Sequence, residues 1–181
     1  MAVKFMEYNI DVYEIDETNK YRFALGSLSE KTLFVFGVNP STADDKKPDN
    51  TIKKVMGFAE KNGYKSFMML NLYPQRATNP NKLSNEIDRM MMNKNLEVIL
   101  HLLSLKKEAD ILLAWGGLIF SRSYLPLCLK EIYQSIKDYS LNFYRIGDFL
   151  KSGQPRHPLY AGYKQEFQVV DMDKYLQEFN I

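Results

Sequence analysis

The chain has 181 residues, a formal net charge of +2, 45% hydrophobic and 25% charged residues. These values are typical of a globular protein with one α/β domain over residues 1–181, and the charge is too small to indicate nucleic-acid binding by itself. The single cysteine, Cys128, excludes an intrachain disulfide and a cysteine-based metal site. We expect no metal and no cofactor. No apolar run has the length of a membrane span, and no signal core follows residues 1–5. These features favour a cytoplasmic protein without a membrane partner, and they leave the oligomeric state open.

The apolar patterns predict alternating strands and helices. Two short strands, residues 8–15 and 21–28, form an N-terminal β-hairpin around a polar turn. The four apolar runs that follow predict central strands over residues 32–38, 66–72, 110–115 and 141–146. Helical spacing predicts helices over residues 49–62, 84–107, 120–137 and 171–179. The alternation favours a three-layer fold, with a four-stranded parallel central sheet and helices on both faces.

Polar side chains follow each of the four central strands. Because the carboxyl ends of parallel strands meet at one edge of a sheet, we expect these side chains to share one site. In chain order they are Asn39, Ser41, Thr42 and Asp44; Asn71, Tyr73 and Arg76; Trp115; and Arg156 with His157.

The first loop supplies the candidates for water activation. The amide of Asn39 both donates and accepts hydrogen bonds, so it suits orienting a water or recognising a base edge; the alternative is an asparagine that stabilises a turn. Asp44 is the candidate general base. The hydroxyl groups of Ser41 and Thr42 suit an anion, although they equally suit the backbone of their own loop.

The later loops supply charge and aromatic rings. Arg76 and Arg156 predict a phosphate site, with bracing of loops as the alternative. His157 titrates near neutral pH, which suits acid–base or electrostatic work. Asn71 belongs to the same predicted binding group, and Tyr73 or Trp115 is predicted to stack on a ligand ring, with a core position as the alternative for Trp115. His101 lies in an apolar helical stretch and is predicted to be structural.

Four motifs occur in order along the chain. They are Asn39-Pro40-Ser41-Thr42-Ala43-Asp44, Asn71-Leu72-Tyr73 with Arg76-Ala77-Thr78, Ala114-Trp115-Gly116, and Gly153-Gln154-Pro155-Arg156-His157-Pro158-Leu159-Tyr160. Together they resemble the DUF1643 family of unknown function over about residues 20–162. That family label assigns no activity.

A more distant resemblance concerns the uracil-DNA glycosylase superfamily. The segment Gly37-Val38-Asn39-Pro40 is similar to the G-I-N-P motif of its mismatch-specific branch, and His157-Pro158 is similar to the start of its H-P-S motif. The resemblance implies a uracil-DNA glycosylase-like fold and cleavage of an N-glycosidic bond without a metal. It also implies that Asn39 positions the attacking water and that His157 supports the departing base.

Two functions remain open at this point. The first is hydrolysis of an N-glycosidic bond, with a nucleotide, nucleobase or nucleic acid as partner. The second is a non-catalytic module that binds a nucleotide or nucleic acid at the same site. The lack of an unambiguous general base favours the second, because one asparagine does little acid–base work.

Overall fold

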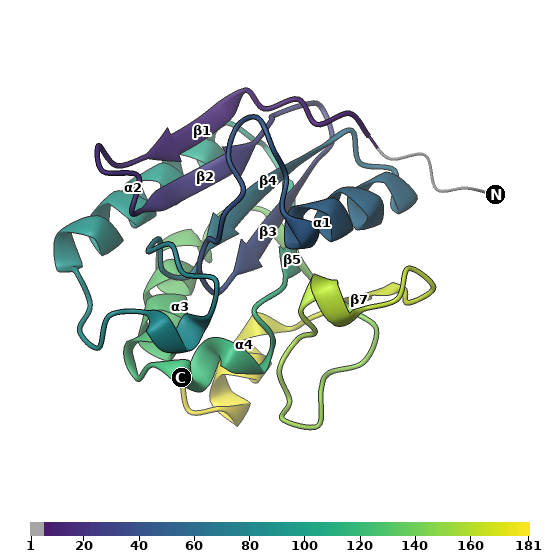
Figure 1. The fold of residues 1–181 in the computed structure, drawn as a ribbon. Coiled ribbons are helices and arrows are strands. Elements are labelled where there is room, and N and C mark those ends of the chain that lie inside the picture. Colours follow the sequence, from purple (N-terminus) through teal and green to yellow (C-terminus); the bar gives the residue numbers. More distant parts are fainter. Residues whose placement is uncertain (1–5) are drawn as a thin grey trace.

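The computed structural model describes residues 6–181; residues 1–5 of the expected domain lie outside the described residues. The strands are β1 (Val12–Ile15), β2 (Arg22–Gly26), β3 (Thr32–Gly37), β4 (Ser66–Asn71), β5 (Ala109–Leu113), β6 (Leu141–Ile146) and β7 (Phe167–Val169). The helices are α1 (Asn50–Lys61), α2 (Arg89–Ser104), α3 (Tyr124–Ile136) and α4 (Met172–Glu178). Three short 3₁₀ helices are η1 (Pro80–Lys82), η2 (Gly116–Ser121) and η3 (Pro158–Tyr160). Figure 1 shows the arrangement of these elements.

The sheet is larger than the sequence predicts. Over the described residues it has seven strands, in the order β1-β2-β4-β3-β5-β6-β7. The strands β4, β3, β5 and β6 pair in parallel, as expected of the four apolar runs. However, β2 pairs antiparallel with β4 and β7 pairs antiparallel with β6, so the expectation of a four-stranded parallel sheet is wrong. The α/β class is confirmed, with a mixed sheet.

The two additions to the sheet have different causes. β2 joins β4 because Gly26 allows a very close approach; a Cβ at this position would lie 2.1 Å from the carbonyl oxygen of Phe67. The strand β7 has only three residues, so it carries too little alternation to be detected in the sequence. It covers the outer edge of β6 and thereby protects that edge from solvent.

Helix boundaries follow the capping residues. The carboxylate of Asp49 accepts a hydrogen bond from the N–H of Ile52, and α1 begins at the next residue, Asn50. The carboxylate of Asp88 caps α2 in the same way, so this helix begins at Arg89 and not near residue 84 as predicted. Such caps satisfy backbone donors that the first turn of a helix leaves without partners.

Both faces of the sheet are covered by helices. In β3, Leu33 and Val35 point to the core that is shared with α1, whereas Phe34 and Phe36 point to the core shared with α2, α3 and α4. This alternation is the period of two that a strand imposes on its side chains. The two cores therefore hold the carboxyl ends of the parallel strands in fixed positions, from which the loops of the candidate site extend.

The described helices include none that is long and apolar enough to cross a membrane.

Candidate ligand site

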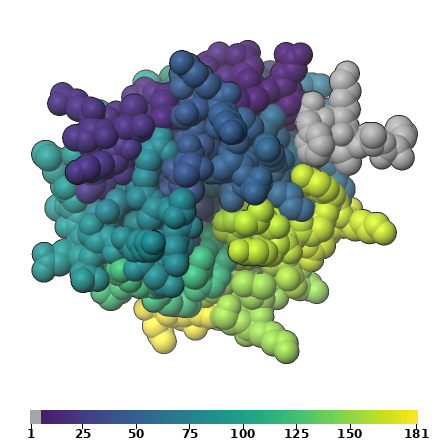
Figure 2. Space-filling model, in the orientation of Figure 1, coloured from purple at the N-terminus to yellow at the C-terminus, as the bar shows by residue number. Residues whose placement is uncertain are grey.

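A cavity of about 430 Å³ lies at the carboxyl ends of the parallel strands. Figure 2 shows it as a hollow where the segments near residues 40–50, 80 and 160 meet. Most of its walls come from five segments: the loop after β3, the first turn of α1, the loop after β4, the start of η2, and the loop that leads into η3. Arg22 of β2 and Met69 of β4 also line it. This volume lies within the range of small-molecule sites.

The cavity brings together six of the ten residues that the sequence predicts for the site. They are Asn39, Ser41, Thr42, Trp115, Arg156 and His157. Four predicted residues do not line it: Asp44, Asn71, Tyr73 and Arg76.

Asn39 presents an acceptor to the site. Its Nδ2 donates to the carbonyl oxygens of Pro40 at 2.9 Å and Ala77 at 2.8 Å, with a longer contact to Gln75 at 3.4 Å. Because all three partners are acceptors, the orientation of the amide is fixed. Within the described part of the chain no hydrogen bond reaches Asn39 Oδ1, so this atom is the one available to a ligand or water.

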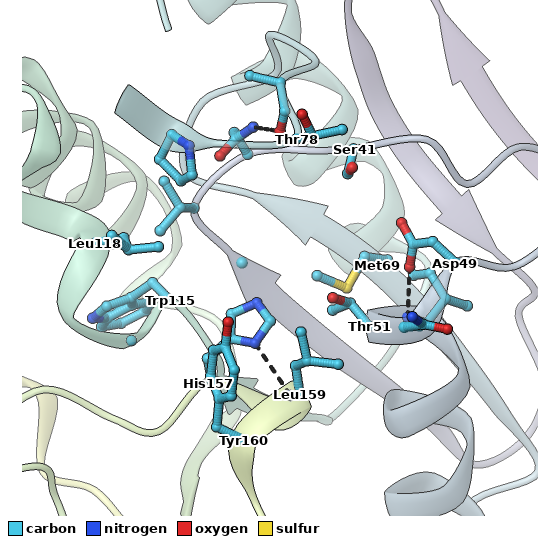
Figure 3. A pocket seen from close by; sticks show the side chains of 18 of the residues that line it. Ser41, Asp49, Thr51, Met69, Thr78, Trp115, Leu118, His157, Leu159 and Tyr160 are labelled. Carbon is cyan, nitrogen blue, oxygen red and sulfur yellow. Dashed lines mark hydrogen bonds between the residues drawn. The ribbon is translucent and has the colours of Figure 1, made fainter. Parts of the chain in front are cut away.

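His157 presents a donor. Its Nδ1 accepts a hydrogen bond from the N–H of Leu159 at 3.2 Å, so the proton of the neutral ring is on Nε2. Figure 3 shows the other ring nitrogen facing into the cavity beside Trp115, Thr51 and Met69. Burial lowers the pKa of His157, and the ring is therefore neutral at pH 7.

Gly116 allows the turn after β5 to approach His157. This residue has φ of +62°, and a Cβ added to it would lie 3.2 Å from the Cβ of His157. Glycine adopts this conformation without the strain that a side chain brings. The Trp115-Gly116 step thus brings a wall of the cavity against the histidine.

Trp115 is fully buried and held from behind. Its Nε1 donates to Gln154 Oε1 at 3.1 Å and to the hydroxyl of Tyr175 at 3.3 Å. These bonds satisfy the polar edge of the indole, which leaves the ring as an apolar wall of the cavity. The sequence left open a stacking or a core position, and this residue occupies a core position that borders the cavity.

Tyr73 and Asn71 lie beneath the site. Tyr73 is fully buried, and its hydroxyl accepts from the N–H of Asp88 at 2.8 Å, so its ring is a core element and not a stacking surface. Asn71 pairs with Gly37 in the sheet and is 1% exposed. Its side-chain amide has no hydrogen-bond partner among the described residues, whereas its main-chain carbonyl oxygen accepts a hydrogen bond from Asn95 Nδ2.

Asp44 lies on the other side of the first loop. Its carboxylate accepts from the N–H groups of Lys46 at 2.9 Å and Lys47 at 2.8 Å. These two hydrogen bonds lower the pKa of Asp44 and close a tight turn. The structure thus places the predicted general base outside the cavity, in a shallow depression that Arg76 also lines.

Arg76 braces the loop. Its guanidinium donates to the carbonyl oxygens of Ser41 and Ala43, to the hydroxyl of Tyr13 and to Oδ1 of Asn19. This is the bracing alternative that the sequence left open.

Arg156, in contrast, does line the cavity, and its Nε donates to the carbonyl oxygen of Asp148 at 3.0 Å.

Several lining residues were not predicted. The principal ones are Arg22, Asp49, Thr51 and Tyr160. Asp49 is the first residue of the helix predicted over residues 49–62, and the sequence gives it no role in the site. Arg22 interrupts the apolar hairpin strand, and a charged residue at such a position is the signal that identifies it as unusual. His101, expected to be structural, is exposed in the last turn of α2.

Residues 6–181 contain no group of three or more histidine, cysteine, aspartate or glutamate side chains placed to hold a metal ion.

A family model described as "Protein of unknown function (DUF1643)" matches residues 22–159. The chain belongs to the DUF1643 family. The segment shared with DUF1643 begins at Arg22 and ends at Leu159, so it includes every lining residue of the cavity except Tyr160. No curated protein and no solved structure matches the chain.

Proposed function

We propose that the cavity binds the base of a nucleoside or nucleotide and that the protein hydrolyses the N-glycosidic bond. The observation that carries this proposal is the pairing in one cavity of an acceptor fixed at Asn39 Oδ1 with a neutral donor at His157 Nε2. Hydrolysis of this bond needs both: an acceptor that orients a water and a donor that stabilises the base as it leaves.

The proposed step is a single displacement. The water oxygen forms a bond to the sugar C1′ while the C1′–N bond breaks, and the electron pair of that bond leaves with the base. Asn39 Oδ1 accepts a hydrogen bond from the water and so directs its lone pair at C1′. His157 Nε2–H donates to the negative charge that develops on the base. The remaining water proton is transferred to the departing base or to solvent.

The resemblance to uracil-DNA glycosylases supports the same assignment. The two motifs that carry it contain Asn39 and His157, and both residues line this cavity. Trp115 supplies an apolar wall against which a planar base packs. The relation to that superfamily, in fold and in activity, is part of the proposal.

A non-catalytic binding module is the second candidate. It is favoured by the state of Asp49, the carboxylate that lines the cavity. One oxygen of Asp49 accepts from the N–H of Ile52 and the other is 3.4 Å from the N of Ala43, so the group is committed to capping and to the loop. A base that must accept a proton is better left free of such donors.

Release of free base decides between the two functions. The protein is incubated with nucleosides, their 5′-monophosphates, and oligonucleotides that contain uracil, hypoxanthine or a mismatch, and the base is measured by chromatography. We expect release with at least one substrate, reduced about 100-fold in His157→Ala and in Asn39→Ala, and unchanged in His101→Ala. Binding without release would support the module, and neither binding nor release would overturn both functions.

A further inference from the structure

Among residues 6–181, Arg22 is a buried cation without an ionic partner. It is 2% exposed, begins β2 and lines the cavity. Its Nη1 donates to the carbonyl oxygen of Ala43 at 3.0 Å, and its Nε has no hydrogen-bond partner in the described structure. Within residues 6–181, no carboxylate lies within ion-pair distance of it. A buried guanidinium in this state is unfavourable unless an anion compensates its charge.

A second guanidinium adds to the positive charge at this end of the cavity. Arg76 donates to the same carbonyl oxygen of Ala43, at 3.1 Å. Burial and the charge of Arg76 lower the pKa of Arg22 to about 10, so Arg22 remains charged at pH 7. Two cations are thus held close together by one neutral acceptor, a geometry that favours an anion on the cavity side.

The neighbouring groups suit a phosphate. The hydroxyl-bearing residues Ser41 and Thr42 line the cavity from the loop after β3, and Asn50 and Thr51 line it from the first turn of α1. Helix N-termini offer N–H donors and partial positive charge to anions. The opposing charge is Asp49, which acts electrostatically on Arg22 while its carboxylate caps the helix. Tyr8 lies near Arg22 as well, and burial raises the pKa of Tyr8 to about 12, so its hydroxyl carries no charge that would balance the guanidinium at pH 7.

We propose that the Arg22 end of the cavity binds a terminal phosphate, so that the ligand is a mononucleotide and not a free base or an internal residue of a strand. The phosphate site stands on Arg22 and the groups around it, whereas the nucleotide assignment rests on the proposed function. A phosphate reaches a side chain that is 2% exposed only by entering the cavity. An internal phosphodiester carries chain on both sides, which this enclosure disfavours.

The test compares nucleosides with their 5′-monophosphates by calorimetric titration. In the wild-type protein we expect at least one monophosphate to bind about tenfold more tightly than its nucleoside, because charged hydrogen bonds to a phosphate are stronger than those to neutral groups. Arg22→Met is expected to abolish this preference. Arg145→Met is the matched control: Arg145 also has an unpartnered Nε but does not line the cavity, so the preference should persist.

Thermal melting separates an anion site from a structural brace. Arg22→Met removes a buried charge and keeps an apolar stem, so its Tm in phosphate-free buffer should equal or exceed that of the wild type. Added inorganic phosphate should raise the wild-type Tm and leave the variant unchanged. A variant that melts much lower and keeps its response to phosphate would overturn the proposal. If Arg22→Met does not fold, Arg22→Lys must show a weakened but measurable preference for monophosphates; no preference would overturn it.

The outcomes distinguish this inference from the proposed function. Equal binding of nucleoside and monophosphate by the wild type overturns the phosphate site and leaves the base site standing. An Arg22-dependent response to inorganic phosphate without binding of any nucleoside supports the phosphate site and overturns the base site. A 5′-phosphorylated oligonucleotide that binds as tightly as the mononucleotide overturns the restriction to mononucleotides.

Discussion

At the scale of single residues, Gly116 and Gly117 offer a matched pair. Only Gly116 combines a positive φ with a close approach to His157, whereas a Cβ on Gly117 would meet nothing nearer than Ser152 Oγ at 3.9 Å. We therefore expect Gly116→Ala to lower stability by about 1 kcal/mol and to weaken ligand binding by displacing His157. Gly117→Ala should change neither. Urea unfolding and ligand titration of both variants measure this, and equal effects would show that the approach to His157 is unimportant.

The histidine itself gives a prediction about pH. The pKa of His157 is lowered by burial, whereas in the unfolded chain it is near 6.5. As the pH falls below about 6.5, the unfolded state binds the proton first, so stability falls until the pH reaches the folded pKa. His157→Gln has no imidazole at this position, so its stability lacks this dependence on pH. Unfolding free energies from pH 8 to pH 5 should run parallel for the two proteins above about pH 6.5 and diverge below it, with the wild type losing more. Parallel curves over the whole range would contradict a ring that is kept neutral by partial burial.

At the scale of elements, the loop between β3 and α1 depends on Arg76. Its guanidinium holds the carbonyl oxygens of Ser41 and Ala43 and ties them to Tyr13 of β1. Arg76→Ala should therefore lower stability by about 2 kcal/mol. Arg156→Ala removes one hydrogen bond, to the carbonyl oxygen of Asp148, and should lower stability much less. Urea denaturation measures both. If Arg156→Ala proves the more destabilising change, the bracing assignment for Arg76 is wrong.

The cap of α1 connects helix stability to the cavity. Asp49 caps α1 beside the cavity, and Asp171 caps α4 through the N–H of Lys174 without lining the cavity. Replacing either residue by alanine should cost about 1 kcal/mol. Only Asp49→Ala should alter ligand binding, and for an anionic ligand the affinity should rise because a nearby negative charge is removed. The same titration on both variants checks this, and a fall in affinity for Asp49→Ala would give its carboxylate a direct role in binding.

At the scale of the whole molecule, the sequence predicts the parallel strands well and the edges of the sheet poorly. The apolar runs that became β3 and β4 are long and buried, so their pattern is unambiguous. The strand β7 is set by pairing with β6 and not by its own three residues. The start of α2 is another local detail that the pattern misses. The helical pattern extends back to about residue 84, but the helix begins only after its capping residue, Asp88.

The candidate site follows the same logic. Asn39, Trp115 and His157 line one cavity, as the sequence leads us to expect, because each follows a strand whose direction the pattern fixes. Asp44 and Arg76 were misplaced because the direction of a side chain in an irregular loop depends on tertiary contacts, here the backbone bonds of each residue. The sequence does not identify Arg22 as a site residue because this residue belongs to the N-terminal hairpin. It lies beside the cavity only because β2 pairs with β4, and the sequence does not predict that pairing.

One consequence follows from Trp115. It is the only tryptophan in the chain, and it is fully buried. Its ring lines the cavity, and its Nε1 donates hydrogen bonds to Gln154 and Tyr175. When tryptophan is excited selectively over tyrosine, the emission therefore comes from one residue, at the place where a ligand is expected. A compound that enters the cavity should shift or quench the emission, and one that binds elsewhere should leave it unchanged. Compounds can therefore be screened on the unlabelled protein before any reaction is known.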